Sequence, residues 1–441
     1  MSASNTTTSP FKMFIFFIFF MFAAVGMIMF ALFQATGGGE DIGDVTMWGT
    51  LPEDQFTIFL TELALTDRDI SNIRYSYTPE ERFNTTLIEA LASGRGPDIV
   101  LLTNDQILQH RDRMFITPYE QYSTRDFKDT YIESAEALLL PEGIIGLPVA
   151  IDPMVLYWNR DLLANNQYSL PPKEWGDLFK MSQKITRRNE SGNIELATIA
   201  LGEFTNIRHA KDIFIAMLMQ AGGNLTDLDN NGNQIATLNK KSAKGTSPAQ
   251  DALRFYTSFV DPAKNTYTWS KAQPQARDAF VAGDLALYIG YASELTLMLA
   301  QNPNLNFDVV QLPQLPGGAQ ERKSTVARVY ALAIPKIAYN PQGAGVLLNM
   351  LTSMNASQLL EKTTGLPSPR RDLLAAEPSD ALKTTFRNSA IMAQAWRDPN
   401  PLATYNILKK MVESVSSGSQ RMSQAIERAQ RELKVLIEKN N

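Results

Sequence analysis

An uncharged apolar segment near the N-terminus most constrains what this chain can become. Residues 13–33 carry no charged side chain and are dominated by Phe, Met, Ile and Ala, and about 20 such residues in a helix span a bilayer. Only Lys12 and the terminal amine precede the segment, whereas Glu40, Asp41 and Asp44 follow it. The positive-inside tendency therefore places residues 1–12 in the cytoplasm and the bulk of the chain outside, as a single-pass protein of the cell membrane.

A cleaved secretory signal is the alternative interpretation of this segment. Signal peptides have an apolar stretch of roughly 7–15 residues that ends at an A-x-A-like site, and residues 31–35 (ALFQA) match that site poorly. We therefore expect an uncleaved transmembrane anchor. The chain contains no cysteine, which excludes a lipid anchor on a processed N-terminal cysteine, disulfide bonds and thiol chemistry.

The composition of the chain is that of a globular protein with a large core. Apolar side chains make up 44% of its 441 residues, which suffices for two or three compact lobes. The 41 basic and 46 acidic residues are spread without a block of one sign, so we expect no nucleic-acid partner. Residues 34–43 are rich in Gly and predict a flexible linker before the folded part.

Hydrophobic periodicity predicts a parallel sheet at the start of the folded part. Strand patterns occupy residues 45–48, 73–77 and 99–102, and helical spacing of apolar residues occupies 56–63 and 83–91 between them. Alternation of strand and helix is typical of a parallel α/β sheet.

The second half of the chain has longer blocks of one kind of structure. An extended segment is predicted at residues 146–159, and a run of helices from about 175 to 259. Strands return at 285–289, 307–312 and 326–334, and the chain is predicted to be helical from residue 342 onward.

Eight segments together carry a resemblance to a known family. They are GRGPDIVLLTND (94–105), LPVAIDPMVLYWNRDLL (147–163), PPKEW (171–175), QAGGNLTDLDNNG (220–232), AFVAGDLALYIGY (279–291), LPQLPGG (312–318), VYALAIPK (329–336) and GLPSPRRDLL (365–374). Each is weak alone, but their order and spacing along the chain make coincidence improbable. From about Asp44 to its end the chain resembles the solute-binding proteins of carbohydrate ABC importers, the group that includes the maltose-binding protein.

The resemblance implies a two-lobed α/β fold of the type II periplasmic-binding-protein kind, with ligand in the cleft between the lobes. It implies three crossovers, near residues 149–153, 328–331 and 366–370. The expected first lobe comprises residues 44–150 and 330–366, and the expected second lobe comprises 151–329 and 367–441. Closure around a ligand would be a hinge motion.

Polar residues of the expected cleft follow from the family's pattern. Carboxylates and amides pair with sugar hydroxyls, and Asp105, Asp152 and Glu203 match positions that look like hydroxyl partners. Asn104 and Arg328 are further polar candidates.

Aromatic residues of the cleft would cover the C–H faces of a sugar. Tyr291 and Tyr405 match positions where relatives carry a cleft aromatic, and Trp269 and Trp48 are additional candidates. Packing in the core is the alternative for each, because it is the commoner position of a large aromatic side chain.

Metal and cofactor sites find no support in the sequence. The run DLDNNG (227–232) fits the first half of a calcium loop, but Leu238 stands where a bidentate Glu is required, so a hairpin turn is favoured. His110 and His209 are far apart and have no second ligand at metal spacing. No P-loop or G-x-S-x-G motif is present, and we expect neither a cofactor nor catalytic residues.

Three functions are compatible with these features. The first is a monomeric receptor that binds a small solute, expected to be a carbohydrate, and delivers it to ABC permease subunits driven by a separate ATPase. The second is a membrane-tethered glycosidase that uses two carboxylates. The third is a solute-sensing subunit, although a cytoplasmic segment of about a dozen residues would need a partner to signal.

Overall fold

Alternating strands and helices begin the described part of the chain, as predicted. The computed structural model describes residues 42–230, 232–242, 245–316, 323–378 and 380–439. Strand β1 (Val45–Gly49) is followed by α2 (Glu53–Ala64), β2 (Ile73–Tyr77), α3 (Glu80–Ala92) and β3 (Ile99–Thr103). Both β2 and β3 pair with β1 in parallel, because each intervening helix returns the chain to the same end of the sheet.

The expected anchor lies outside the described residues. Residues 13–33 and most of the linker 34–43 belong to the part of the chain that is not described. Among residues 42–439, apart from the short internal gaps, no helix is long and apolar enough to cross a bilayer. Residues Val45–Asn441 form one unit by their internal contacts, and that unit carries the strands and helices that the structure describes.

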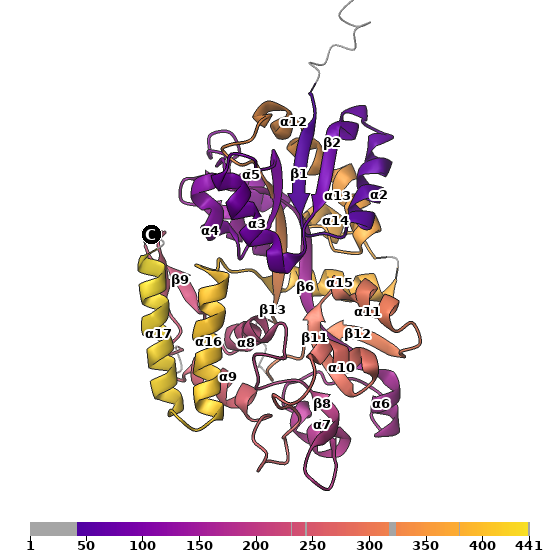
Figure 1. Cartoon of the computed structure of the whole chain (residues 1–441), viewed down its shortest axis with the longest axis vertical. Coiled ribbons are helices and arrows are strands. Elements are labelled where there is room, and N and C mark those ends of the chain that lie inside the picture. Colours follow the sequence, from indigo (N-terminus) through magenta and orange to yellow (C-terminus); the bar gives the residue numbers. More distant parts are fainter. Residues whose placement is uncertain (1–41, 231, 243–244, 317–322, 379, 440–441) are drawn as a thin grey trace, which may run out of the picture. The chain divides into compact units, whose positions relative to one another are not determined.

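Two long antiparallel strands connect two groups of elements (Figure 1). The first half of β6 (Leu147–Asn159) pairs with β13 (Thr325–Ala333), and its second half pairs with β11 (Leu285–Tyr291) and β12 (Phe307–Gln311). β13 pairs in turn with β3, so the sheet runs in the order β2-β1-β3-β13-β6-β11-β8-β7. We call the elements around β1, β2 and β3 the first lobe, and those around β8, β11 and β12 the second lobe.

A third segment, residues 366–370, lies against this pair of strands. The Ile151 N–H donates to the Pro367 carbonyl at 2.9 Å, and the Ile132 N–H donates to the Pro369 carbonyl at 3.0 Å. The predicted two-lobed α/β fold is therefore present in the described residues, while the expected lobe bounds stay a prediction.

The predicted run of helices between residues 175 and 259 is wrong in part. Helices α7 (Asp177–Ile185), α8 (Ala210–Gln220) and α9 (Pro248–Thr257) are present, but β8 (Ile194–Ile199) lies between the first two. Its six residues, IELATI, are too few for a helix of ordinary length and pair in parallel with β11, where five of them are buried. The favoured hairpin turn is also present, between β9 (Thr226–Leu228) and β10 (Gln234–Ala236).

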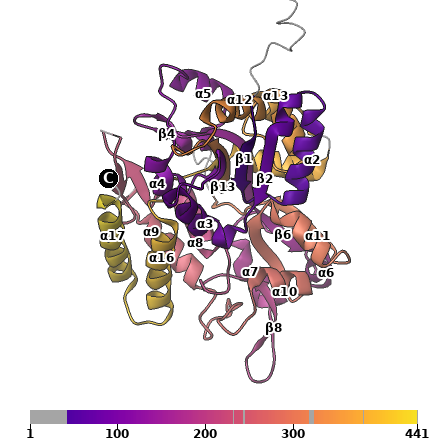
Figure 2. The same cartoon turned by 45° about the horizontal axis from the view of Figure 1, so that its top comes forward.

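The predicted helical C-terminal part is confirmed. Helices α16 (Pro401–Ser416) and α17 (Met422–Glu438) lie side by side in both views of the molecule (Figures 1 and 2). The Asn400 side chain accepts from the Ala403 N–H at 3.0 Å and starts α16. The remaining elements are α4 (Ile107–His110), α5 (Thr124–Thr130), β4 (Leu139–Leu140), β5 (Gly143–Ile144), α6 (Arg160–Asn165), β7 (Arg187–Arg188), α10 (Ala276–Ala282), α11 (Glu294–Gln301), α12 (Pro341–Leu351), α13 (Met354–Thr364), α14 (Arg371–Leu374), α15 (Ala381–Ile391), β14 (Ala393–Gln394) and three 3₁₀ turns, Arg68–Asn72, Arg111–Arg113 and Glu133–Leu138.

One buried carboxylate connects two distant segments of the first lobe. Asp98, directly before β3, accepts from the Thr46 N–H at 2.9 Å and from the Thr46 hydroxyl at 2.8 Å. Its other oxygen accepts from the Asn340 N–H at 2.7 Å, at the start of α12. Asp98 thus joins β1 to a segment that is distant in the sequence.

We expect Asp98→Ala to lower the free energy of unfolding by about 2–4 kcal/mol, because the N–H groups of Thr46 and Asn340 lose a charged, largely buried acceptor. Denaturant unfolding of the full-length chain in detergent measures this. Asp112→Ala removes an exposed carboxylate and is the control, expected within about 0.5 kcal/mol of the wild type. Equal effects of the two substitutions would contradict the assignment.

Candidate functional site

A cavity of about 740 Å³ lies between the two lobes, beside β13. Residues from α3 and from the loop after β3 line it on the first-lobe side, and residues around α8, α10 and the start of α16 line it on the other. Its charged or partly charged lining residues are Glu80, Glu81, Asp105, Arg208, His209, Lys211, Asp212, Arg277, Asp278 and Arg328. The site is therefore rich in charges of both signs.

Arg328 connects three elements at the base of this cavity. From β13, its Nη1 lies 2.7 Å from Oε1 of Glu80 on α3. Its guanidinium also lies over the ring of Tyr291, 4.3 Å from the centroid. The nearby Arg328 cation lowers the pKa of Glu80 below its usual range, although partial burial opposes this shift. Arg328 is thereby held in one place in the absence of ligand.

Arg208 forms a bridge between the lobes. It precedes α8 in the second lobe, and its Nη2 lies 2.7 Å from Glu81 and 3.4 Å from Glu80, both on α3 of the first lobe. These side chains are 37% to 64% exposed, so each pair contributes little to overall stability. The bridge is weak enough for a bound solute to rearrange it.

Lys211 and Asp398 form a buried pair under the cavity. Nζ of Lys211 lies 2.6 Å from Oδ2 of Asp398, whose other oxygen accepts from the Thr404 hydroxyl at 2.6 Å. Burial lowers the pKa of Lys211, but the carboxylates of Asp398, Asp212 and Asp105 together outweigh it and raise that pKa above its usual value. Because Thr404 lies in the first turn of α16, this pair also positions the neighbouring Tyr405 at the cavity wall.

A second buried network holds His209. Its Nε2 lies 2.7 Å from Oε1 of Glu294, which also accepts from the Tyr291 N–H at 3.0 Å. The other Glu294 oxygen accepts from the Tyr288 hydroxyl at 2.7 Å. Burial opposes ionisation of Glu294, yet the neighbouring His209 and these hydrogen bonds lower its pKa to about 2. Glu294 is therefore an ionised carboxylate that fixes the cavity floor.

Three of the nine predicted ligand residues line the cavity. They are Asp105, Arg328 and Tyr405. Asn104, which is 3% exposed, lies next to Asp105 and donates to the Trp396 carbonyl at 2.7 Å. Tyr291 is 3% exposed beneath Arg328, and one face of its ring is covered.

The other four predicted residues lie away from the lining. Asp152 is fully buried on β6, and Trp269 is fully buried with its Nε1 donating to Asn206 at 3.1 Å. Glu203 is 6% exposed, and Trp48 packs against the first-lobe core. Direct ligand contact by Asn104, Tyr291 and these four stays a prediction.

Sequence reasoning missed most of the charged lining. Glu80 and Glu81 follow β2, and Arg208, Lys211 and Asp212 follow β8, each near the carboxyl end of a parallel strand. Ligands of open α/β sheets bind at that edge. Applying this rule to the first helical turn after each strand would have found Glu80 and Glu81, whereas the other three required β8 to be recognised.

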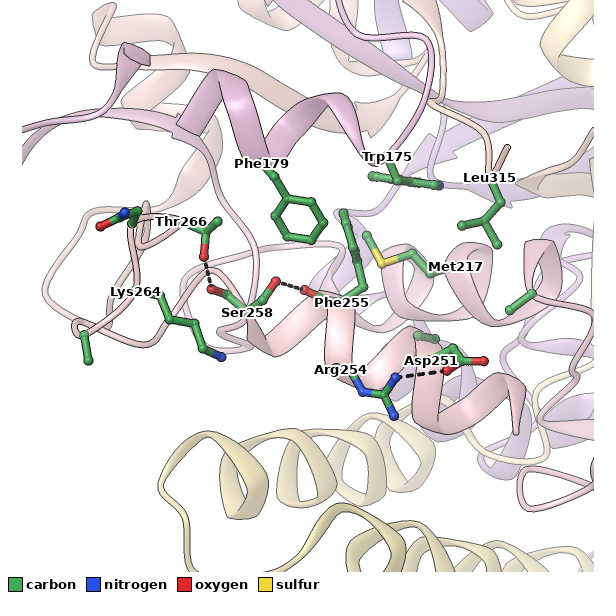
Figure 3. A pocket seen from close by; sticks show the side chains of 14 residues that line it. Trp175, Phe179, Met217, Asp251, Arg254, Phe255, Ser258, Lys264, Thr266 and Leu315 are labelled. Atoms are coloured by element: carbon green, nitrogen blue, oxygen red, sulfur yellow. Dashed lines mark hydrogen bonds and ion pairs between the residues drawn. The ribbon is translucent and has the colours of Figure 1, made fainter. Parts of the chain in front are cut away.

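A second cavity, of about 660 Å³, lies within the second lobe (Figure 3). Phe255 of α9 contacts both Trp175 and Phe179, with ring centroids 5.7 and 5.3 Å apart. Met217 and Leu315 complete its apolar wall. Trp175 is 1% exposed and donates to Gln220 at 2.6 Å. No first-lobe residue lines this cavity, so a solute bound here would not join the lobes.

The fold and the interlobe cavity define a two-lobed binding protein, and comparison with known sequences identifies its family. Residues 66–388 match the profile of the bacterial extracellular solute-binding proteins, and the chain belongs to that family. A galactooligosaccharide-binding protein of Bacillus subtilis is 22% identical over 343 residues, 76% of each chain. A maltodextrin-binding protein of the same organism is 21% identical over 312 residues, 70% of this chain and 69% of its own length.

Solved structures show the same fold. The GacH receptor of Streptomyces glaucescens, crystallised without ligand and with acarbose, superimposes with a TM-score of 0.71 at 15% sequence identity. The match covers 90% of this chain and 98% of that receptor. A protein with bound mannotriose matches with a TM-score of 0.68 at 22% identity, over 89% of this chain and all of the other.

Asp152 makes the stability of the unit depend on pH. The side chain is fully buried, and its Oδ1 accepts from the Ser293 N–H at 2.9 Å, whereas Oδ2 has no partner among the described residues. Burial raises its pKa to about 6, against the opposing influence of Ser293 and Arg328. As pH rises from about 4 to about 6, the unfolded chain loses this proton before the folded one does, so stability falls through that window.

We expect Asp152→Asn to be more stable than the wild type by about 1–3 kcal/mol above about pH 7, and to show no such gain near pH 4. The amide keeps the acceptor for Ser293 and removes the buried charge. Unfolding of both proteins is measured across the pH range, and the difference between them isolates this group. A difference that does not change with pH would contradict the raised pKa.

Proposed function

We propose that this protein is the extracytoplasmic receptor of an ABC importer and binds a sugar or oligosaccharide between its lobes. The observation that carries the proposal is the cavity of about 740 Å³ whose lining comes from both lobes beside β13. Its volume lies in the range of small-molecule sites. The names of the similar proteins, which bind galactooligosaccharide and maltodextrin, support a carbohydrate as the ligand.

The lining residues suit hydroxylated solutes. Asp105 and Asp212 face the cavity from opposite lobes and present carboxylate oxygens that accept from hydroxyls. Tyr405 presents a partly exposed ring, packed on Phe204 with centroids 5.5 Å apart and with its hydroxyl donating to the Phe204 carbonyl at 3.1 Å. That ring can cover a sugar face without a large loss of side-chain freedom.

Closure of the lobes would couple binding to delivery. A solute that contacts Asp105 and Asp212 together binds the closed arrangement more tightly than the open one, and this difference in affinity shifts the equilibrium toward closure. The closed form would then dock on permease subunits whose separate ATPase drives import. A glycosidase gains no support from the geometry, since Asp152 and Glu203, two of the three carboxylates expected to serve it, do not line the cavity.

The N-terminal segment completes the proposal. Residues 13–33 would hold the receptor at the membrane as an uncleaved anchor, with residues 1–12 in the cytoplasm and the lobes outside. A tethered receptor stays near its permease, which raises the effective concentration of the closed form at the docking surface.

To test binding, the full-length chain in mild detergent is titrated calorimetrically with a panel of mono- and oligosaccharides, and the recovered sugar is analysed. We expect saturable binding of intact sugar, weakened about tenfold or more by Asp105→Asn and by Tyr405→Ala through loss of a charged acceptor and of a stacking face. Glu195→Gln, an exposed second-lobe substitution outside the cavity, should bind as the wild type does. If no sugar of the panel binds, or if the recovered sugar is cleaved, the proposal is overturned.

To test anchoring, we expect the full-length chain to remain with the membrane fraction after an alkaline wash, since a spanning helix is held by its apolar length. A chain lacking residues 13–33 should be recovered in the supernatant. Intact-mass measurement of the native protein tests the alternative. A mature form that begins after residue 33 would identify the segment as a cleaved signal and contradict the anchor.

A further inference from the structure

Each arginine and lysine that lines the interlobe cavity lies within 4 Å of a carboxylate, and among them only Arg277 keeps a buried nitrogen, Nε, without a hydrogen-bond partner among the described residues. The pairs are Arg208 with Glu81, Lys211 with Asp398, Arg277 with Glu294 and Arg328 with Glu80, at 2.7, 2.6, 3.6 and 2.7 Å respectively. A guanidinium or ammonium that already has a carboxylate partner offers less attraction to an anionic solute. Apart from Arg277, these cations therefore offer little attraction to a carboxylate or phosphate group.

Three lining carboxylates lack a cationic partner among the described residues. They are Asp105 after β3, Asp212 on α8 and Asp278 on α10. The Asp105 carboxylate accepts one hydrogen bond, from the Thr103 hydroxyl, and Asp212 and Asp278 accept none from the described part of the chain. These oxygens remain available to a bound solute from both lobes.

The excess of negative charge is concentrated around Lys211. Its ammonium is bonded to Asp398 and is also acted on by Asp212 and Asp105. Arg328, which is paired with Glu80, is also acted on by Asp212. Two cations thus stand among four carboxylates, and this local balance favours a further positive charge.

Two nearly buried tyrosines lie beside Arg328, which forms the base of the cavity. Tyr291 and Tyr330 are 3% and 6% exposed, and neither phenol has a hydrogen-bond partner among the described residues. Burial raises the pKa of both, and the Asp105 carboxylate contributes to each shift. Neither tyrosine is part of the cavity lining.

We propose that the solute of this cavity is a saccharide bearing a protonated amino group, which binds between Asp105 and Asp212. The inference rests on the proposed sugar-binding function and narrows its substrate class. A sugar ammonium would donate to both carboxylates, one from each lobe. Hydrogen bonds between two ionised groups are stronger than those from a neutral hydroxyl, so the amine would add affinity and join the lobes.

The decisive experiment compares sets of oligosaccharides matched in linkage and length but different in charge. Neutral, 2-amino-2-deoxy and uronate forms of α- and β-linked chains are titrated calorimetrically into the full-length chain in mild detergent, below the pKa of the amine. We expect the tightest ligand to carry the amine and to bind about ten- to a hundredfold more tightly than its neutral counterpart. Its affinity should fall with added salt more steeply than that of the neutral form.

The two outcomes that oppose the proposal are distinct. If the tightest ligand is neutral or a uronate, the amine specificity is overturned while sugar binding stands. If no saccharide of any set binds, the proposed function itself is overturned, and the amine specificity with it.

Matched variants locate the amine. Asp212→Asn and Asp105→Asn, made separately on the two lobes, should each reduce the preference for the amino form over the neutral form about tenfold. Glu195→Gln removes one negative charge outside the cavity and should leave that preference unchanged. If all three variants keep the wild-type preference, the amine does not bind between Asp105 and Asp212. Thermal unfolding of each variant serves as the control that the variant is folded.

Discussion

The antiparallel pairing of β6 with β13 is the interaction on which the rest of the structure depends. β6 has 13 residues, about 40 Å of extended chain at roughly 3.3 Å per residue, and is the one strand that pairs with both β13 and the second-lobe strands among those described. The register shifts between Tyr330 and Ala331, and such irregularities bend a strand locally. Relative motion of the lobes must pass through this pair and through residues 366–370 beside it.

The cavity floor is built from charged and polar side chains that are paired with one another within the protein. Glu294 holds His209, and Asp398 holds Lys211, each pair in contact and largely removed from water. Buried ion pairs are weak evidence for stability, because desolvation offsets much of their attraction. Their effect here is positional, since Asp398 also caps the region that presents Tyr405, and Glu294 fixes the backbone of Tyr291. A solute therefore meets groups already held in place.

Local pattern predicted the first lobe well, because its strands and helices are long and regularly periodic. The prediction failed at β8, where six residues between two helices carry too little periodicity to be separated from their neighbours. For the site, resemblance placed Asp105, Arg328 and Tyr405 at the cavity. It could not tell that Trp269 is fully buried or that Arg328 covers Tyr291, because the burial of an aromatic side chain depends on contacts distant in sequence. Asp212 was missed for the same reason, since its approach to Asp105 is created by the folding of two lobes.

The two large cavities differ in what binding could do. A solute in the apolar cavity of the second lobe would contact Trp175, Phe179 and Phe255 equally well whether the lobes were open or closed. A ligand with equal affinity for two states does not change the equilibrium between them. A solute in the second-lobe cavity therefore cannot drive closure, however tightly that solute binds. In the interlobe cavity, Tyr405 is the one tyrosine of the described lining, Pro401 and Leu402 are its apolar members, and most other lining residues are charged or polar. Recognition there must come mainly from directed hydrogen bonds, whose geometry is complete only when both lobes approach the same solute.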